Sequence, residues 1–258
     1  RSLGYHIPGR FDKLINIDEC FLQPEPSNSI RDAAREFAFE HSLEFFNLRF
    51  KTGFLRNIVI RNNLKGEFMI TLVVAKEETE ILAEFTKFIT SRFPEIVSLY
   101  AAINDKLNDS LENVPFIHLF GKTHLEEELD GLKFQIAPAS FFQTNTEQAL
   151  NLYNAALNMI NWTGNETVYD LYSGTGTISA FLARKAKKVI GVEYVEAAVN
   201  DGNANMKLNN IQNVKLLHGD MSKMFNFDFG KRHGFPDIVF TDPPRAGMHP
   251  KVVSSIAE

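Results

Sequence analysis

The second half of the chain alternates short apolar runs with amphipathic stretches. Four apolar runs end near Asp170, Glu193, His218 and Thr241. Helical patterns cover residues 146–161, 177–186 and 196–209. Strands that alternate with helices in this way form a parallel sheet with right-handed crossovers. We therefore expect an α/β, doubly wound, Rossmann-like domain over residues 136–258.

The ends of the chain suggest that it belongs to a longer protein. The fourth predicted strand would lie at an open edge of the sheet, and an unpaired edge strand tends to associate. We therefore expect the C-terminal strands of this sheet to lie beyond Glu258. The first residues, from Arg1, include neither an initiator Met nor a signal-peptide pattern.

The first half of the chain has a less regular order of predicted strands and helices. We predict helices over residues 30–41 and 80–93, with Ser27, Asn28 or Ser29 as the cap of the first. The predicted strands cover residues 56–60, 68–74, 97–103, 117–120 and 132–136, and residues 62–66 form a hairpin turn between the first two. Because strands and helices do not alternate regularly, we expect a smaller α+β central domain over residues 1–135.

Composition narrows the class of protein. The apolar fraction of 44% and the charged fraction of 23% are those of a soluble globular protein, and no apolar run is long enough to span a membrane. The net charge of −5 argues against a uniformly basic coat for nucleic acid but is compatible with a local basic groove. The single cysteine, Cys20, excludes an internal disulfide framework and favours a reducing, cytoplasmic setting.

A glycine loop follows the first apolar run of the second half. Gly174 and Gly176 allow close approach of the backbone to a ligand, and Glu193 lies at the distance along the chain typical of a ribose-binding acid. The third glycine of a dinucleotide loop is absent, because Ser179 stands in its place. We therefore expect S-adenosylmethionine, which has no phosphate groups, as the cofactor.

Acidic side chains recur at the predicted carboxyl ends of the strands, where doubly wound sheets bind ligands. They are Asp170, Glu193, Asp220 and Asp242. An acid-lined pocket suits the sulfonium and ammonium groups of S-adenosylmethionine. In this interpretation Glu193 binds the ribose hydroxyls and Asp220 lies near the adenine. The alternative for any single acid is a helix cap or a solvated loop position.

The fourth strand runs into Asp242-Pro243-Pro244-Arg245. Two prolines make this loop rigid, so that it can hold Asp242 against a planar substrate. Amine methyltransferases of nucleic acids have a related loop, but an aromatic residue stands at the position of Arg245. The arginine argues against amine methylation and favours contact with a phosphate or carboxylate, although a solvated arginine at a rigid turn is the simpler alternative.

Two aromatic residues precede the parallel domain. Phe141 could stack on an extruded base or belong to the core, whereas we expect Phe142 to be a core residue. Gln143 could hydrogen-bond the cofactor or the edge of a base.

Taken in order, Phe-x-Gln-x-Asn, Asp-Leu-Tyr-Ser-Gly-Thr-Gly, Gly-Val-Glu and Asp-Pro-Pro-Arg-Ala-Gly resemble the RNA uridine-5-methyltransferases over nearly the whole chain. These bacterial enzymes methylate carbon 5 of uridine in ribosomal or transfer RNA. The resemblance implies S-adenosylmethionine as cofactor and RNA as partner, with 23S ribosomal RNA expected before transfer RNA. We expect neither a membrane nor a protein partner.

The resemblance also implies roles for individual residues. Phe141 corresponds to an aromatic position near the target base, and Arg245, which belongs to the Asp-Pro-Pro-Arg-Ala-Gly motif, is the second residue that we expect at the substrate. The positions that correspond to cofactor contacts are Gln143, Tyr172, Thr177, Glu193, Asp220 and Asp242. Two of them depart from the usual pattern, because relatives often have Asn at the Thr177 position and can have Asn at that of Asp220.

The resemblance places the covalent chemistry outside this chain. The nucleophilic cysteine and the base glutamate of the family would follow Glu258, so no catalytic residue is expected here and the chain alone should be inactive. Cys20 corresponds to the fourth cysteine of an iron–sulfur cluster, which only a longer chain could complete. The competing hypotheses are a nucleic-acid amine methyltransferase and a non-catalytic module that binds cofactor or RNA.

Overall fold

The computed structural model describes residues 3–47 and 49–257, and the chain divides into two compact units, residues 1–125 and 126–258. This boundary precedes the predicted one after residue 135. The difference concerns the strand pair β7 (Leu125–Leu129) and β8 (Leu132–Ile136). Strand β8 packs on helix α5 (Glu196–Leu208) of the second unit, which explains why the pair belongs there.

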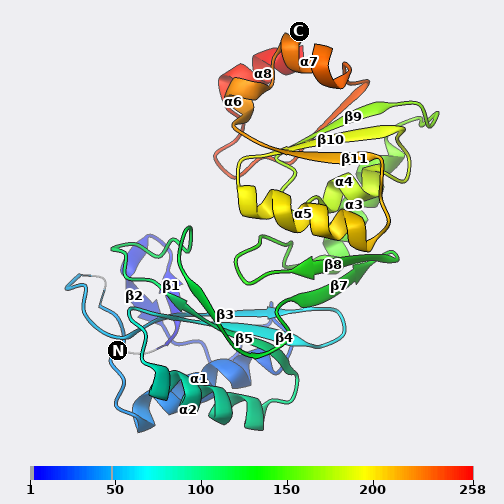
Figure 1. The fold of residues 1–258 in the computed structure, drawn as a ribbon. Helices are drawn as coiled ribbons and strands as arrows, with labels where there is room; N and C mark the ends of the chain where they lie inside the picture. Colours follow the sequence, from blue (N-terminus) through cyan, green and yellow to red (C-terminus); the bar gives the residue numbers. More distant parts are fainter. Residues whose placement is uncertain (1–2, 48, 258) are drawn as a thin grey trace. The chain divides into compact units, whose positions relative to one another are not determined.

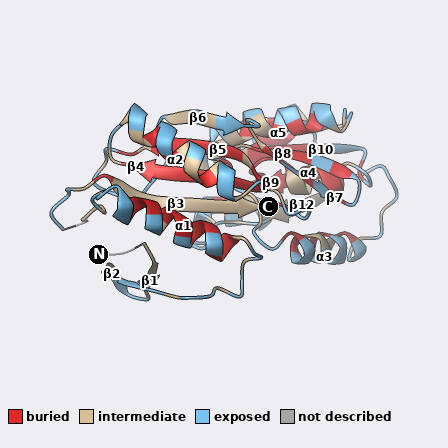
Figure 2. Ribbon diagram, turned by 90° about the horizontal axis from the view of Figure 1, so that it is seen from below, coloured by how far each residue is buried: buried red, intermediate tan, exposed pale blue. Residues whose placement is uncertain are grey.

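The first unit is an α+β fold, as predicted. Its sheet has the order β3-β4-β5-β6, in which β4 and β5 are parallel and the outer pairs are antiparallel. The strands are β3 (Leu55–Asn62), β4 (Phe68–Val74), β5 (Ile96–Ile103) and β6 (Phe116–Gly121). Helices α1 (Ser27–Glu40) and α2 (Thr79–Arg92) turn their buried faces to the sheet and their exposed faces to solvent (Figure 2). A separate hairpin contains β1 (Tyr5–Ile7) and β2 (Arg10–Ile15).

The predicted hairpin turn at residues 62–66 is confirmed by the antiparallel pairing of β3 with β4. The predicted cap of the first helix is wrong, because α1 begins at Ser27 and its N-cap residue is Pro26. Asn28 has another role, since its Oδ1 accepts a hydrogen bond of 3.0 Å from the backbone amide of Cys20. The hairpin β1–β2 and strand β7 were not predicted.

The second unit contains the parallel sheet that the alternating pattern predicted. Its strands are β9 (Thr167–Leu171), β10 (Lys188–Glu193), β11 (Val214–His218) and β12 (Ile238–Thr241). They lie in the order β11-β10-β9-β12, and every pair is parallel. Helices α3 (Thr146–Asn158), α4 (Thr177–Leu182) and α5 cover one face (Figure 1). Helices α6 (Met221–Met224), α7 (Phe227–His233) and α8 (Pro250–Ala257) cover the other.

Alternation along the strands divides the core of this unit between the two helical layers. Val168 and Val189 pack with α3, α4 and α5, whereas Tyr169, Ile190 and Val192 pack with α6, α7 and α8. Both faces of β9 and β10 are buried, which explains why their sequences are nearly continuous apolar runs. None of the described helices is long and apolar enough to cross a membrane.

Candidate cofactor and substrate site

The loop between β9 and α4 has an unusual backbone. Tyr172 has a φ of 65°, and Gly174 and Gly176 have φ values of 54° and 75°. The amides of Tyr172 and Ser173 both donate to the carbonyl oxygen of Val192, at 3.0 and 3.1 Å. A bulky residue with positive φ costs conformational free energy, and such positions gather at ligand-binding sites.

The two glycines of this loop are required for different reasons. A Cβ at Gly176 would lie 3.0 Å from Leu216 Cδ1, so this glycine permits close packing of the loop on β11. A Cβ at Gly174 would meet nothing within 4 Å, so the backbone of Gly174 faces open space. Of the two glycines, Gly174 is therefore the one whose backbone is open to a ligand.

Glu193, at the end of β10, joins this loop to the start of α5. Its Oε2 accepts a hydrogen bond of 2.9 Å from the amide of Gly174, and its Oε1 accepts one of 2.8 Å from the amide of Val195. Each carboxylate oxygen has a second lone pair. The carboxylate can therefore hold the loop and still accept the two hydroxyls of a ribose.

Asp170 lies within β9 rather than after it, which corrects the expected strand boundary. Its side chain is fully buried, and its Oδ2 accepts a hydrogen bond of 2.5 Å from Ser179 Oγ. Its Oδ1 accepts no hydrogen bond from any residue that the structure describes. Burial raises the pKa of this carboxyl group to about 7, and the negative charges of Asp242 and Glu193 add to the shift. A buried carboxylate with an unpartnered oxygen fits a cationic ligand such as S-adenosylmethionine.

Asp242 is exposed directly after β12, and its charge acts on two buried groups. It raises the pKa of Asp170, and it also acts on Tyr153 of α3. Burial, followed by the charges of Asp242 and Asp170, raises the pKa of the Tyr153 hydroxyl to about 12. The charge of Asp242 therefore reaches both the buried carboxyl group of Asp170 and the hydroxyl group of Tyr153. Sequence reasoning missed Tyr153, because it has the spacing of an ordinary core residue of a helix.

Asp220 is a helix cap in this structure. Its Oδ1 accepts hydrogen bonds from the amide and the hydroxyl of Ser222, at 2.9 and 2.7 Å, and its Oδ2 lies 3.3 Å from Lys223 Nζ. The Ser222 hydrogen bonds, with the charge of Lys223, lower the pKa of its carboxyl group. Asp220 therefore has the helix-cap role that we considered as the alternative for any single acid. Its predicted position near the adenine of the cofactor stays a prediction.

The two aromatic residues before α3 have different environments: the core position expected for Phe142 is confirmed, and of the two alternatives left open for Phe141 the core position is wrong. Phe142 packs against the core, with its ring centroid 5.9 Å from that of Phe134. Phe141 is 70% exposed, so its ring is available to a ligand. Gln143 is half-buried, and Asn145 caps α3 by accepting a hydrogen bond of 3.1 Å from the amide of Gln148. The segment that contains Phe141 is thus anchored on both sides.

The loop after β12 forms a tight turn. The amide of Gly247 donates to the carbonyl oxygen of Pro244 at 2.7 Å, and the turn exposes Arg245. Thr177, at the start of α4, is half-buried, with its hydroxyl 3.5 Å from that of Thr175. These positions are compatible with the predicted contacts of Arg245 and Thr177 but do not assign them.

Cys20 lies in the first unit and is a free, half-buried thiol. Within residues 3–47 and 49–257, no group of three or more His, Cys, Asp or Glu side chains is arranged to hold a metal ion. An iron–sulfur role of Cys20 therefore stays a prediction for the longer protein.

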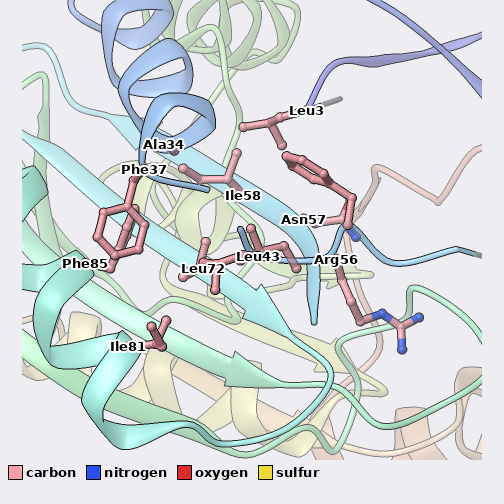
Figure 3. Close-up of a pocket in the computed structure, with 12 residues that line it drawn as sticks. Leu3, Ala34, Phe37, Leu43, Arg56, Asn57, Ile58, Leu72, Ile81 and Phe85 are labelled. Atoms are coloured by element: carbon pink, nitrogen blue, oxygen red, sulfur yellow. The ribbon is translucent and has the colours of Figure 1, made fainter. Parts of the chain in front are cut away.

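An apolar pocket lies elsewhere, in the first unit between α1, α2 and the sheet. Figure 3 shows Phe37 and Phe85 beside Leu72 and Leu43, while the guanidinium group of Arg56 extends away from them. The guanidinium group donates hydrogen bonds to the carbonyl oxygens of Asn104 and Lys106, at 2.8 and 2.6 Å. Because Arg56 is the only titratable residue among the described residues that line it, this pocket is a gap in the apolar core rather than a second reactive site.

Comparisons with known proteins agree with the geometry. Residues 117–258 match the model of the tRNA (uracil-5-)-methyltransferase family. The chain is 47% identical, over 99% of its length, to a protein of Bacteroides thetaiotaomicron described as an uncharacterized RNA methyltransferase, and 43% identical over 99% to one of Porphyromonas gingivalis with the same description. It covers 57% and 55% of these two proteins, so it spans little more than half their length.

A solved structure gives the same result. The crystal structure of Pyrococcus abyssi tRNA (uracil-54, C5)-methyltransferase in complex with S-adenosyl-L-homocysteine matches 95% of this chain and 58% of that chain, with a TM-score of 0.75 and 27% identity. The chain belongs to the tRNA (uracil-5-)-methyltransferase family.

Proposed function

We propose that the full-length protein transfers the methyl group of S-adenosylmethionine to carbon 5 of a uridine in RNA. The observation that carries the proposal is the group of carboxylates at the strand ends. Asp170, with its unpartnered Oδ1, Glu193 and Asp242 interact electrostatically beside the open face of the glycine loop. Family membership and the S-adenosyl-L-homocysteine bound to the Pyrococcus abyssi relative support it.

The residues of this chain would hold the cofactor by charge and by backbone contact. Glu193 would accept the ribose hydroxyls, the backbone of Gly174 would lie against the ligand, and Asp170 and Asp242 would balance its positive charge. We propose as further contacts Gln143, Tyr172, Thr177 and Asp220. When bound, S-adenosylmethionine supplies a methyl group on an electrophilic sulfonium.

Carbon 5 of uracil is a poor nucleophile, so the reaction needs covalent activation. A thiolate that adds to carbon 6 makes carbon 5 an enolate carbon able to take the methyl group; a base then removes the proton from carbon 5, and the carbon–sulfur bond breaks to release the thiolate. Cys20 is not among the strand-end groups of the second unit. We place the thiolate and the base on a cysteine and a glutamate that follow residue 258 in the longer protein.

Two residues of this chain would act on the substrate. A base must leave its stack to reach the cofactor, and the exposed ring of Phe141 would stack on it. Arg245, exposed on its tight turn, would contact an RNA phosphate. We propose 23S ribosomal RNA as the substrate and the cytoplasm as the place of action. Cys20 would serve as the fourth ligand of an iron–sulfur cluster.

The deciding experiment uses the full-length protein with radiolabelled S-adenosylmethionine and unmodified transcripts of 23S ribosomal RNA and of transfer RNA. We expect 5-methyluridine in the ribosomal transcript, identified by mass spectrometry of nucleosides. The same RNA containing 5-fluorouridine should become covalently attached to the protein, because fluorine at carbon 5 prevents release of the thiolate. Methylation of an exocyclic amine without covalent attachment would favour the amine methyltransferase. Labelling of transfer RNA alone would show that transfer RNA, and not 23S ribosomal RNA, is the substrate.

Cofactor binding is tested separately by calorimetry with S-adenosylhomocysteine. The Glu193→Gln variant keeps one carbonyl acceptor but loses the charge and the second acceptor, so binding should weaken by at least about tenfold. Glu196→Gln, on the first turn of α5, is the matched control and should bind as the wild type does. Equal affinities of Glu193→Gln and the wild type would overturn the assignment of Glu193.

A further inference from the structure

We infer that a surface centred on α7 binds single-stranded RNA away from the reactive centre. This inference takes the class of partner from the proposed function. The α7 surface consists of six exposed residues, four cationic and two aromatic: Lys188, Lys215, Lys231, Arg232, Phe227 and Phe235. None of them belongs to the site described above.

Lys231 and Arg232 belong to α7, whereas Lys188 and Lys215 project from neighbouring strands on one face of the sheet. Lys215 is paired with Ile190 across β10 and β11, and Lys188 precedes Ile190 by two residues. Residues two apart on a strand, and residues paired across strands, project from the same face. Ile190 packs in the cluster that contains Phe229 of α7. Lys188 and Lys215 therefore project on the side of the sheet that α7 covers.

The C-terminal end of α7 lies next to these two lysines. Lys188 Nζ donates a hydrogen bond of 2.7 Å to the carbonyl oxygen of His233, the last residue of the helix. The charges that act on the His233 ring are all positive: burial, followed by the charges of Lys215, Arg232 and Lys188, lowers its pKa. A protein with a net charge of −5 thus gathers cations at this position, which favours a polyanionic ligand.

The neighbouring carboxylates are already engaged. Asp228 pairs with Lys231, with 3.7 Å between Oδ1 and Nζ. Asp237 accepts a hydrogen bond of 2.8 Å from the backbone amide of Thr167 through its Oδ2. Lys188 Nζ and Arg232 Nε each donate to a backbone carbonyl oxygen, of His233 and Asp228. Among the described residues no carboxylate forms an ion pair with Lys188, Lys215 or Arg232, so their positive charges remain available to phosphate groups.

Two exposed rings belong to this surface, and one of them lies beside Lys231. Phe227 is 65% exposed and Phe235 is 55% exposed, and their centroids are 5.2 Å apart. Lys231 Nζ lies 4.7 Å from the centroid of Phe227. Cations that track a backbone, next to rings on which bases can stack, are the features by which proteins bind single-stranded nucleic acid. The pairing of rings with cations favours RNA over a polyanion without bases.

The α7 surface and the reactive centre lie at opposite ends of the strands. Lys188 begins β10 and Glu193 ends it, so the six residues of the strand place them roughly 17 Å apart. RNA bound at α7 would therefore be a segment that flanks the target uridine. Variants of this surface should leave cofactor binding intact.

The test measures binding of the full-length protein to fluorescein-labelled poly(U) RNA by anisotropy over a range of salt concentrations. For the double variant Lys188→Gln/Lys215→Gln we expect weaker binding. Its log–log salt slope should be smaller by about 1.4, or about 0.7 for each phosphate that a lysine no longer neutralises. For Phe227→Ala we expect roughly fivefold weaker binding or more, with little change in slope.

Matched controls carry the same substitutions elsewhere. Lys207→Gln on α5 and Phe39→Ala on α1, both exposed in the wild type, should retain wild-type RNA binding. S-adenosylhomocysteine binding and thermal unfolding should be unchanged in all four variants. Wild-type affinity and slope in the α7 variants, equal losses in the controls, or no poly(U) binding by the wild type would overturn the inference.

The two proposals can fail independently. If the α7 variants lose RNA binding while the protein forms no 5-methyluridine, the RNA-binding surface is supported and the proposed reaction is overturned. If 5-methyluridine is formed and the α7 variants bind RNA as the wild type does, the proposed reaction is supported and the RNA-binding surface is overturned.

Discussion

Asn205 of α5 hydrogen-bonds both backbone groups of Gln135 on β8. Its Oδ1 accepts from the amide of Gln135 at 2.8 Å, and its Nδ2 donates to the carbonyl oxygen of Gln135 at 3.3 Å. One turn later, Asn209 bonds both backbone groups of Lys133, at 2.8 and 2.6 Å. Two asparagine side chains thus take the place of a neighbouring strand along β8. This contact fixes the strand that leads to the Phe141 segment.

Replacing Asn205 with alanine should destabilise the protein. The side chain of Asn205 is almost fully buried, so the change leaves the amide and carbonyl groups of Gln135 without partners in a place that water reaches poorly. We expect a loss of about 2 kcal/mol in the free energy of unfolding, measured by urea denaturation. Asn203→Ala, at an exposed position of the same helix, is the control and should be nearly neutral. Equal stabilities of the two variants would contradict the structural role of Asn205.

A second prediction separates backbone strain from ligand contact. Gly174 and Gly164 both have positive φ, of 54° and 82°, and a Cβ at either would meet nothing within 4 Å. Alanine at either position should therefore cost about 1 kcal/mol in stability. Only Gly174→Ala should lose S-adenosylhomocysteine binding in calorimetry, because only its Cβ would enter the space assigned to the ligand. Similar affinities of the two variants would place the ligand elsewhere.

A third prediction concerns pH. The pKa of Asp170 is raised from 3.8 to about 7 in the folded protein. Between these values the folded state holds a proton that the unfolded state has released, so stability falls as pH rises through this window. Asp170→Asn imitates the protonated form and keeps an acceptor for Ser179. Relative to the wild type, this variant should therefore gain stability between about pH 5 and pH 8.

Urea denaturation at both pH values provides the measurement for Asp170. The control is Asp105→Asn, an exposed position in the first unit, which should follow the wild type at each pH. A constant difference between Asp170→Asn and the wild type across the range would show that Asp170 is ionised throughout.

The fourth prediction uses neighbouring phenylalanines as controls for each other. Phe142 packs in the core and Phe141 is exposed. Phe142→Ala should lower stability by about 2 kcal/mol because it removes buried apolar surface from the core. Phe141→Ala should leave the melting temperature unchanged and, in the full-length protein, greatly reduce methyl transfer to RNA. Full activity of Phe141→Ala would exclude the stacking role.

The alternating pattern was sufficient to predict the parallel sheet, because strands covered on both faces are short apolar runs that local sequence displays. Positions that depend on contacts were less predictable. Asp170 was placed after its strand because a charged residue is expected at a strand end, yet it is buried within β9, where Ser179 partners it. Strand β7 and the hairpin β1–β2 are short and carry many polar residues, so no apolar run marks them. Each pairs with the next strand along the chain, across Asp130-Gly131 and Pro8-Gly9.

The same division holds for the site. The sequence by itself determined the alternation of the four parallel strands with the helices α3, α4 and α5, the glycine loop and Glu193, because spacing along the chain fixes what a strand–loop–helix unit presents at its end. Only the tertiary structure decided that Asp170 Oδ1 lacks a partner, that Asp220 caps a helix, and that Tyr153 and the α7 cations lie where they do. These properties depend on burial and on charges brought together by folding, which no local pattern contains.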